Sequence, residues 1–217
     1  RFFMELVIID GARTPFGKFG GGLKDLSSVQ LGVLASEAAI QRAGVNKEEI
    51  DHVVFGNVVQ AGADAPYLAR HIGIRSGIPI ATPALTVNRL CGSGLQAVVN
   101  AAQQILLGES RLVLAGGSEN MSQIPYVLPN ARWGYRMGDH KAVDMMTAAL
   151  VDSCAQVAMS DTAENLAKEY GISREAQDEF ALRSQQAAAQ AMASGRLAKE
   201  IVPVELHDKH QTVIAQD

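Results

Sequence analysis

Cysteine is scarce in this chain, which carries only Cys91 and Cys154 among its 217 residues. Two cysteines make no disulfide framework, and they fit a reducing compartment. Long apolar runs are also missing, because none approaches the ~20 residues that a membrane-spanning helix requires. The charges are mixed and nearly balanced, with a net charge of −4, so nothing in the composition indicates a nucleic-acid partner. We therefore expect no membrane segment and no nucleic-acid-binding role.

Several familiar motifs are absent as well. The Gly17-Lys18 pair lacks the glycine spacing of a phosphate-binding loop, and Gly116-Gly117-Ser118-Glu119 lacks the spacing of a dinucleotide-binding turn. His207 and His210 are spaced as metal ligands can be, but no cysteine or second acidic cluster accompanies them, so a solvated loop is expected there. No metal site is predicted. A charged region and a cleavage site are missing at the start, so no signal peptide is expected.

One cysteine lies at a marked change in the sequence pattern. Apolar residues at helical spacing predict a helix over residues 93–107, which Gly108 closes; they are Leu95, Val98, Val99, Ala102, Ile105 and Leu106. An extended segment, residues 84–90, precedes this helix, so Cys91 lies where a strand gives way to a helix. Gly92 and Gly94 permit a sharp turn. The unpaired N–H groups at a helix start favour a thiolate, which makes Cys91 a candidate nucleophile. A small buried hydrophobe is the alternative that spacing alone leaves open.

The remaining pattern in the first half alternates strands and helices. A near-continuous apolar run predicts a buried strand over residues 4–10, and a capping box at Ser27 opens a helix that Gly44 ends. Further strands are expected at residues 53–59, 83–90 and 111–115, with a short helix at 65–72. Strands separated by helices of this length indicate an α/β layered fold with a largely parallel sheet.

The pattern changes after residue 121. Residues 123–139 carry prolines, glycines and aromatic residues without a sustained period, which predicts a functional or interaction arm. A helix is expected over residues 142–157 with Cys154 in its core, followed by helices ending at Gly171 and Gly195. Residues 200–206 are expected to be extended.

Five stretches together resemble the thiolase family, over about residues 4–206 and in that family's order and spacing. The stretches are Asp10-Gly11-Ala12-Arg13-Thr14-Pro15-Phe16-Gly17, Asn88-Arg89-Leu90-Cys91-Gly92-Ser93-Gly94, Ala115-Gly116-Gly117-Ser118-Glu119-Asn120-Met121-Ser122, Thr162-Ala163-Glu164-Asn165-Leu166-Ala167 and Glu200-Ile201-Val202-Pro203-Val204. Thiolases cleave or form 3-ketoacyl-CoA thioesters. The resemblance implies a layered α/β fold, with a mixed, largely parallel sheet covered by helices, plus a helical loop domain. It assigns residues 1–120 to the N-terminal α/β domain and residues 121–217 to an incomplete loop domain.

The resemblance also implies roles for individual residues. Cys91 would attack the 3-keto carbon, release acetyl-CoA and hold the acyl group until a second CoA collects it. The backbone N–H of Cys91 would be one donor to the developing oxyanion. Leu150 and Met159 match positions that line the pocket for substrate. CoA is thus expected as a substrate, with no cofactor bound permanently.

Two departures from the family pattern qualify this prediction. Ala158 occupies a position where acetoacetyl-specific thiolases usually have histidine, which favours a 3-ketoacyl-CoA thiolase of the mitochondrial type with broad chain length. An acetoacetyl-CoA-specific acetyltransferase is the alternative, and a ketoacyl synthase or a non-catalytic thiolase-like scaffold are more distant ones. The family's acid/base residues belong to a second half that this sequence does not contain.

The resemblance further implies acyl-CoA and CoA as partners. Tyr126, Trp133 and Tyr135 in the segment 123–139 predict that this arm contributes to a homodimer or homotetramer. The compartment would be the cytoplasm in a bacterium and the mitochondrial matrix in a eukaryote. The helix over residues 93–107 carries no charged residue, so it is expected to be buried on most sides, more than one domain can provide.

Overall fold

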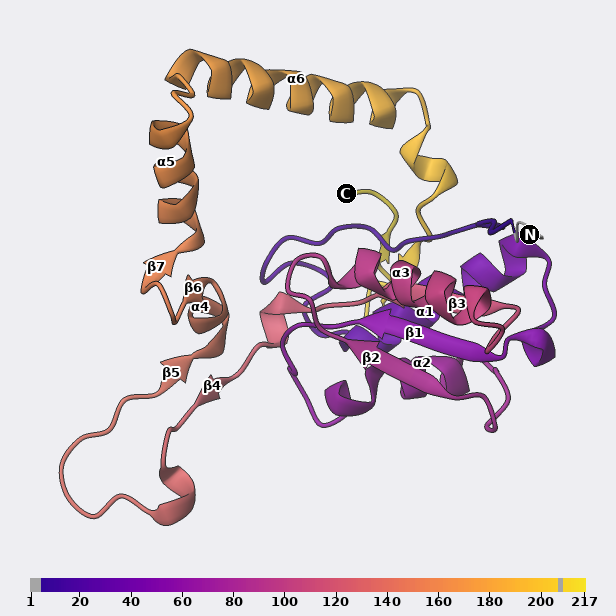
Figure 1. Cartoon of the computed structure of the whole chain (residues 1–217), viewed down its shortest axis with the longest axis horizontal. Helices are drawn as coiled ribbons and strands as arrows, with labels where there is room; N and C mark the ends of the chain where they lie inside the picture. Colours follow the sequence, from indigo (N-terminus) through magenta and orange to yellow (C-terminus); the bar gives the residue numbers. More distant parts are fainter. Residues whose placement is uncertain (1–4, 207–208) are drawn as a thin grey trace. The chain divides into compact units, whose positions relative to one another are not determined.

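The computed structural model describes residues 5–206 and 209–217, which form two units (Figure 1). The first unit comprises the chain up to Ile124 together with Glu200–Asp217, and the second comprises Pro125–Lys199. Each unit is described by itself below.

A three-stranded parallel sheet forms the centre of the first unit. Its strands are β1 (His52–Gly56), β2 (Ala84–Val87) and β3 (Val113–Gly117), in the order β2-β1-β3. Both neighbours run parallel to β1, which places Val54 opposite Leu85 on one side and Ala115 on the other. The carboxyl ends of the three strands therefore meet at one edge of the sheet.

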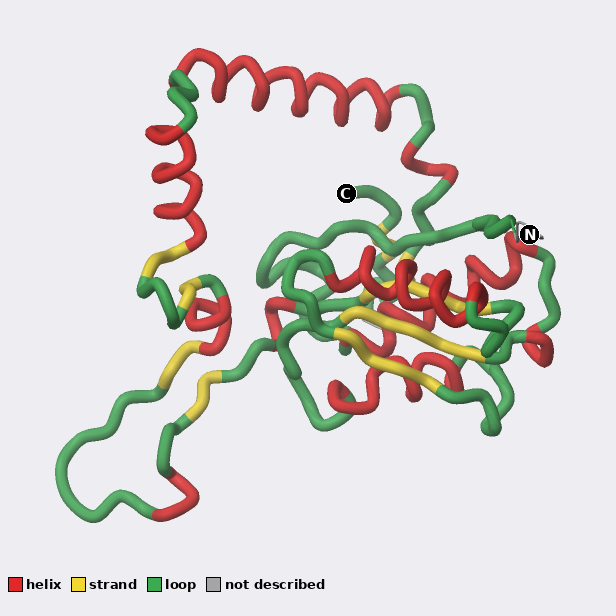
Figure 2. Tube along the Cα trace, in the orientation of Figure 1, coloured by secondary structure: helices red, strands yellow, loops and turns green. Residues whose placement is uncertain are grey.

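Three helices cover this sheet (Figures 1 and 2). They are α1 (Ser28–Ala43), α2 (Leu68–Arg75) and α3 (Ser93–Leu106), with 3-10 turns at Lys47–Glu49, Ala65–Tyr67 and Met121–Gln123. Val53 and Phe55 of β1 share a buried core with Val29 of α1 and Leu68 and Ile72 of α2. Because side chains alternate along a strand, Val54 and Gly56 face the opposite side, where α3 packs. The expected layered α/β fold is confirmed.

Local signals in the sequence set the ends of α1. The Ser27 side chain accepts a hydrogen bond from the Gln30 N–H, and the Gln30 side chain accepts one from the Ser27 N–H, as in a capping box. Gly44 closes the helix in the left-handed conformation, with φ of 64°.

The strand predicted at residues 4–10 is absent from the described part of this segment. Residues 5–10 run without a paired strand, and Val7 and Ile8 are 70% and 83% exposed. Met4 lies outside the described residues. The apolar pattern is that of a buried strand, but no described segment supplies the backbone partner that a strand requires.

The last residues of the chain pack on the first unit, not with the loop segment as the division at residue 120 implied. The Arg13 guanidinium donates to both carboxylate oxygens of Asp217, at 2.7 and 2.8 Å, and to Glu200 at 3.1 Å. The hydrogen bonds from Arg13 hold the pKa of Asp217 below its usual value. Strands β8 (Val204–Glu205) and β9 (Val213–Ile214) pair antiparallel in the same unit.

The second unit consists of short elements and two longer helices. In chain order they are β4 (Tyr126–Val127), a 3-10 turn at Ala131–Trp133, β5 (Val143–Asp144), α4 (Met145–Ala149), β6 (Val151–Asp152), β7 (Val157–Ala158), α5 (Met159–Glu169), α6 (Arg174–Ala193) and a 3-10 turn at Leu197–Lys199. β4 pairs with β5, and β6 pairs with β7, both antiparallel. Helices α5 and α6 lie where the sequence predicted them.

The single helix predicted over residues 142–157 is wrong. Only Met145–Ala149 is helical, and Cys154 lies in the turn of the β6–β7 hairpin, where it is exposed and not in a core. The Asp152 carboxylate accepts hydrogen bonds from the N–H groups of Cys154 and Ala155, at 2.7 and 3.1 Å. Such a side-chain turn competes with helix continuation, and a residue-by-residue apolar pattern does not reveal it.

Residues 125–199 bury almost nothing by themselves. None of the described buried core residues lies between Pro125 and Lys199, and the long helix α6 has no buried residue. Within the described residues, no helix combines the length and the apolar character needed to cross a lipid bilayer.

Candidate active site

Cys91 lies in a tight turn between β2 and α3. The strand ends at Val87, and the helix begins at Ser93. Leu90 adopts a left-handed conformation with φ of 49°, and the N–H groups of Gly92 and Ser93 bond back to the carbonyls of Arg89 and Leu90. The side chain of Cys91 is exposed at this turn. The sequence-based placement of Cys91 between strand and helix is confirmed, and the alternative of a buried hydrophobe is wrong.

Side chains on both sides of Leu90 hold this turn. The Ser93 hydroxyl donates to the Leu90 carbonyl at 2.6 Å and accepts from the Arg89 N–H at 2.8 Å. The Asn88 side-chain oxygen accepts from the Leu90 N–H at 3.0 Å. Polar residues thus satisfy the backbone groups that the sharp change of direction leaves without partners.

Two glycines let the start of α3 lie directly on the sheet. A Cβ atom added at Gly56 would come within 2.5 Å of the backbone carbon of Ser93, and one at Gly117 within 3.2 Å of the Gly94 Cα. Gly56 and Gly117 are the last residues of β1 and β3. Cys91 is therefore placed at the carboxyl edge of a parallel sheet, the edge where α/β proteins bind ligands.

The stretch Gly116–Ser122 fixes the loops around this edge. The Glu119 carboxylate accepts hydrogen bonds from the Val58 and Val59 N–H groups, at 2.8 and 3.2 Å, and from the Asn57 amide at 3.0 Å. The Asn120 amide donates to three carbonyls between Leu23 and Leu26, at 2.6 to 3.2 Å. The sequence pointed to this stretch only through its resemblance, and the role of Glu119 was not predicted.

No acid/base partner of Cys91 is recorded among residues 5–206 and 209–217. The Nε2 atom of His52 lies 3.2 Å from Nε2 of Gln104, and Nδ1 of His71 lies 3.2 Å from Oδ1 of Asp64. The ring of His140 stacks on that of Tyr135. The described residues contain no group of three potential metal ligands; His207 lies outside them. The recorded contacts of these three histidines are with residues other than Cys91, and the source of an acid or base for Cys91 stays a prediction.

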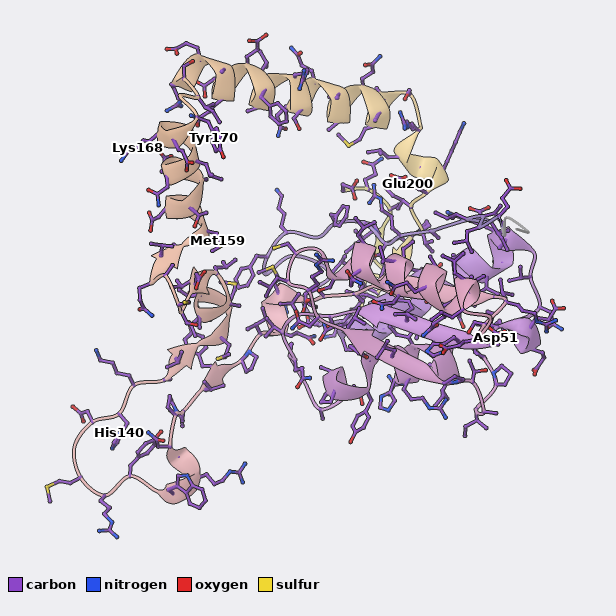
Figure 3. All side chains as sticks on the ribbon, viewed as in Figure 1. Asp51, His140, Met159, Lys168, Tyr170 and Glu200 are labelled. Carbon is purple, nitrogen blue, oxygen red and sulfur yellow. The ribbon has the colours of Figure 1, made fainter. Side chains whose placement is uncertain are left out.

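Leu150 and Met159 lie together in the second unit. The Met159 N–H donates to the Leu150 carbonyl at 3.1 Å, and the two side chains are 45% and 48% exposed. Figure 3 places Met159 at the start of α5. Cys91 belongs to the first unit, so the role of Leu150 and Met159 in its substrate pocket stays a prediction.

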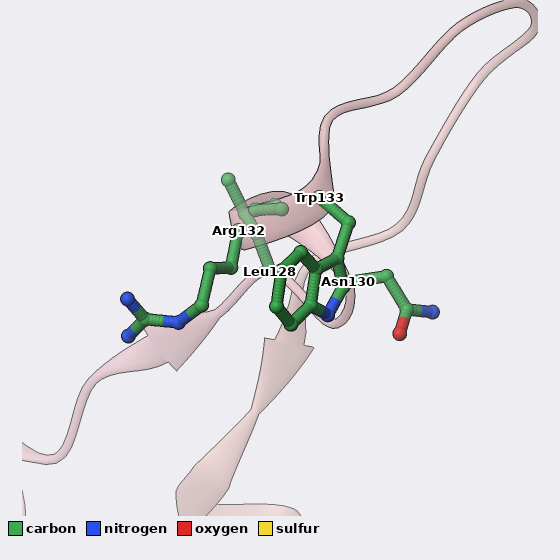
Figure 4. A pocket seen from close by; sticks show the side chains of 5 residues that line it. Leu128, Asn130, Arg132 and Trp133 are labelled. Atoms are coloured by element: carbon green, nitrogen blue, oxygen red, sulfur yellow. The ribbon is translucent and has the colours of Figure 1, made fainter.

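The second unit has an open hollow of about 690 Å³ at its 3-10 turn Ala131–Trp133 (Figure 4). Its lining residues are Leu128, Asn130, Ala131, Arg132 and Trp133. None of them was predicted as a site residue. Because Trp133 is 84% exposed, the hollow is a surface feature of the arm and not an enclosed ligand cavity.

The chain is similar to known proteins along nearly its whole length. The N-terminal domain of thiolases matches residues 6–217. Beta-ketothiolase BktB of Cupriavidus necator is 52% identical over 200 residues, which are 92% of this chain and 51% of that protein. The mitochondrial 3-ketoacyl-CoA thiolase of Homo sapiens is 47% identical over 203 residues, 93% of this chain and 51% of that protein.

A solved structure shows the same fold. The crystal structure of human mitochondrial 3-ketoacyl-CoA thiolase in complex with CoA matches with a TM-score of 0.92 at 45% sequence identity. The match covers 96% of this chain and 52% of that one. The chain therefore spans about half the length of the relatives that it matches.

Proposed function

Because the chain belongs to the thiolase family, as its N-terminal domain, we propose that it supplies the nucleophile half of an acetyl-CoA acyltransferase. The observation that carries this proposal is the exposed Cys91 in a strained turn at the carboxyl edge of the sheet. In the proposed reaction, the Cys91 thiolate attacks the 3-keto carbon of a 3-ketoacyl-CoA. The bond between the α and β carbons breaks, acetyl-CoA leaves with the electron pair and a proton, and the acyl group remains on sulfur. The thiolate of a second CoA then takes the acyl group and regenerates Cys91.

The chain itself positions the Cys91 thiol and supplies one hydrogen-bond donor to this reaction. The turn holds the Cys91 backbone N–H at a helix start, where it can donate to the oxyanion that forms during attack. Such donors are worth about 3–4 kcal/mol of transition-state stabilisation in acyl transfer. The base that deprotonates the thiol and the acid that protonates the departing carbanion are proposed to come from the second half that the relatives possess.

The exposed face of α3 supports the need for such a half. Leu95, Val99 and Leu106 are 74%, 41% and 56% exposed, and the helix carries no charge. An uncharged helix with apolar residues in solvent requires a covering surface. We propose that the second α/β domain of the complete thiolase covers this face, as the thiolase resemblance implies.

The substrate range is proposed from Ala158. This residue precedes Met159, and its small side chain stands where an imidazole would narrow the pocket of an acetoacetyl-specific enzyme. We therefore propose 3-ketoacyl-CoA substrates of varied chain length. Acetoacetyl-CoA-specific activity is the second candidate, favoured by relatives named acetyl-CoA acetyltransferase, one of them 49% identical.

The proposal extends to assembly and compartment. The arm between β4 and β5 exposes Trp133, and exposed aromatic residues are enriched where subunits meet. We propose a homodimer or homotetramer in which the arm of residues 123–139 takes part. Removing residues 128–139, the part of the arm that follows β4, should lower the mass of the oligomer measured by light scattering. The proposed compartment is the cytoplasm in a bacterium or the mitochondrial matrix in a eukaryote.

The proposed activity is tested with the completed enzyme, defined as this chain joined to the second half of a thiolase relative. We expect it to cleave 3-ketoacyl-CoA in the presence of CoA, and Cys91→Ser to abolish cleavage. Cys154→Ser is the matched control, because Cys154 is also exposed but lies in the β6–β7 turn. Cleavage that survives in the Cys91→Ser enzyme, or is lost in the Cys154→Ser enzyme, contradicts the proposal.

A further inference from the structure

The backbone conformation immediately before Cys91 is strained. Leu90 has φ of 49°, a region that costs a residue with a Cβ atom of order 1–2 kcal/mol. Such a conformation persists only where surrounding contacts hold it. The Ser93 hydroxyl bonds the Leu90 carbonyl from the helix side, and Asn88 bonds the Leu90 N–H from the strand side.

Asn88 connects this strained residue to a different loop. Its side-chain oxygen accepts from the Leu90 N–H at 3.0 Å, while its side-chain nitrogen donates to the Val58 carbonyl at 3.1 Å. Both ends of one amide are therefore used, one on each loop. A displacement of Val58 would pull Asn88 away from Leu90.

Val58 is in turn fixed by Glu119. The carboxylate accepts from the Val58 and Val59 N–H groups at 2.8 and 3.2 Å, and from the amide of Asn57, which is only 4% exposed. Hydrogen bonds to an ionised carboxylate are stronger than neutral ones. Glu119 takes part in no ion pair recorded for the described residues, so its charge is held by these N–H donors.

A continuous series of hydrogen bonds thus runs from the end of β3 to the turn that carries Cys91. We propose that Glu119 and Asn88 are positioning residues, which hold Leu90 in its strained conformation and so keep the Cys91 sulfur and N–H in the geometry for acyl transfer. The proposal rests on the proposed acyltransferase function. It adds that acyl transfer depends on a carboxylate whose hydrogen bonds go to Asn57, Val58 and Val59 and not to Cys91.

Three variants of the completed enzyme test the proposal: Glu119→Gln, Asn88→Ala and the double variant. Glutamine keeps the size of Glu119 but directs an NH₂ group at N–H donors, so it cannot accept all three hydrogen bonds. Glu109→Gln is the matched control, since Glu109 is exposed on the turn after α3 and makes no recorded side-chain hydrogen bond.

Two reactions of Cys91 are compared in each variant. Transfer of the acetyl group from acetyl-CoA requires the aligned turn, whereas alkylation by iodoacetamide requires only access to the sulfur. We expect Glu119→Gln and Asn88→Ala each to slow acetyl transfer about tenfold or more, because small misplacements are costly in acyl transfer. Alkylation should change less than about threefold, and Glu109→Gln should change neither rate. Equal losses in both reactions would indicate general damage and overturn the proposal.

The double variant tests whether the two residues act through one path. We expect it to transfer acetyl groups about as slowly as the slower single variant, because either change already breaks the connection. If the double variant slows acetyl transfer by the product of the two single-variant factors, the two residues do not act through one path and the proposal is overturned.

Hydrogen exchange tests the connection without acyl chemistry. Glu119→Gln should raise exchange at the Leu90 amide as well as at Val58, and unchanged exchange at Leu90 overturns the proposal. A wild-type enzyme that never accepts an acetyl group contradicts the proposed function instead, and the exchange experiment still decides the positioning role.

Discussion

Replacing Gly56 with alanine should displace the helix that follows Cys91. The new Cβ atom would lie 2.5 Å from the backbone carbon of Ser93, 2.7 Å from its oxygen and 2.8 Å from the Gly94 nitrogen. All three are backbone atoms, so no side chain can rotate away. Restoring ordinary contact at about 3.5 Å requires the start of α3 to move by about 1 Å.

This displacement has an expected cost in stability and in rate. Overpacking of this kind costs about 1–3 kcal/mol, offset by up to about 1 kcal/mol from the reduced freedom of the unfolded chain. A net loss of about 2 kcal/mol lowers Tm by roughly 4–8 °C in a protein of this size. Because the moving segment carries Cys91, a shift of about 1 Å should also lower kcat by roughly 100-fold.

The assay is thermal unfolding followed by circular dichroism, together with acetyl transfer to Cys91 in the completed enzyme. Gly62→Ala is the matched control, because a Cβ atom at Gly62 meets nothing within 4 Å. We expect the control to retain both Tm and rate. A Gly56→Ala protein with unchanged Tm and unchanged acetyl transfer would refute the close packing of α3 on β1.

Three further predictions follow from other features. Asp217→Asn should lower stability by at most about 1 kcal/mol at neutral pH. Because Arg13 lowers the folded-state pKa of Asp217, this contribution to stability is present above the unfolded pKa of about 3.9 and is lost as pH falls through the folded-state pKa. The free energies of unfolding in urea of wild type and variant should therefore converge in acid. A difference in unfolding free energy that persists in acid contradicts the pairing of Arg13 with Asp217. Because the apolar face of α3 is exposed in the 217-residue chain by itself, we expect that chain to self-associate through this face. Leu95→Gln should weaken this association by about 1 kcal/mol, roughly fivefold, in light scattering without lowering Tm, and unchanged association would contradict an apolar contact through α3. Ala158→His should lower kcat/KM for an eight-carbon 3-ketoacyl-CoA about tenfold relative to acetoacetyl-CoA, and an unchanged ratio would remove the argument from Ala158.

Local sequence signals were sufficient to predict the helices that cover the parallel sheet and the position of the turn at Cys91. Ser27 and Gly44 define the ends of α1, because caps depend on neighbouring residues. Cys91 lies in the predicted strand-to-helix turn, but the left-handed residue of that turn is Leu90 and not one of the glycines. These signals act over four or five positions, which is why they are visible in one sequence.

The sequence-based predictions were wrong or incomplete where the structure depends on contacts between residues far apart in the chain. The apolar run at residues 4–10 has the composition of a strand, but a strand also requires a neighbour, and none of the described residues supplies one. The Asp152 turn interrupts the helix predicted over residues 142–157. Glu119 contacts residues about sixty positions earlier, so its connection to the turn at Cys91 has no local signal.

The central claim is that Cys91 forms the acyl-enzyme, and mass spectrometry tests it directly. The completed enzyme is incubated with acetyl-CoA, quenched in acid and digested. We predict one acetyl group, attached to the peptide that contains Cys91 and absent from the peptide that contains Cys154. An acetyl group on any other residue, or none on a folded enzyme that still cleaves 3-ketoacyl-CoA, would contradict the claim.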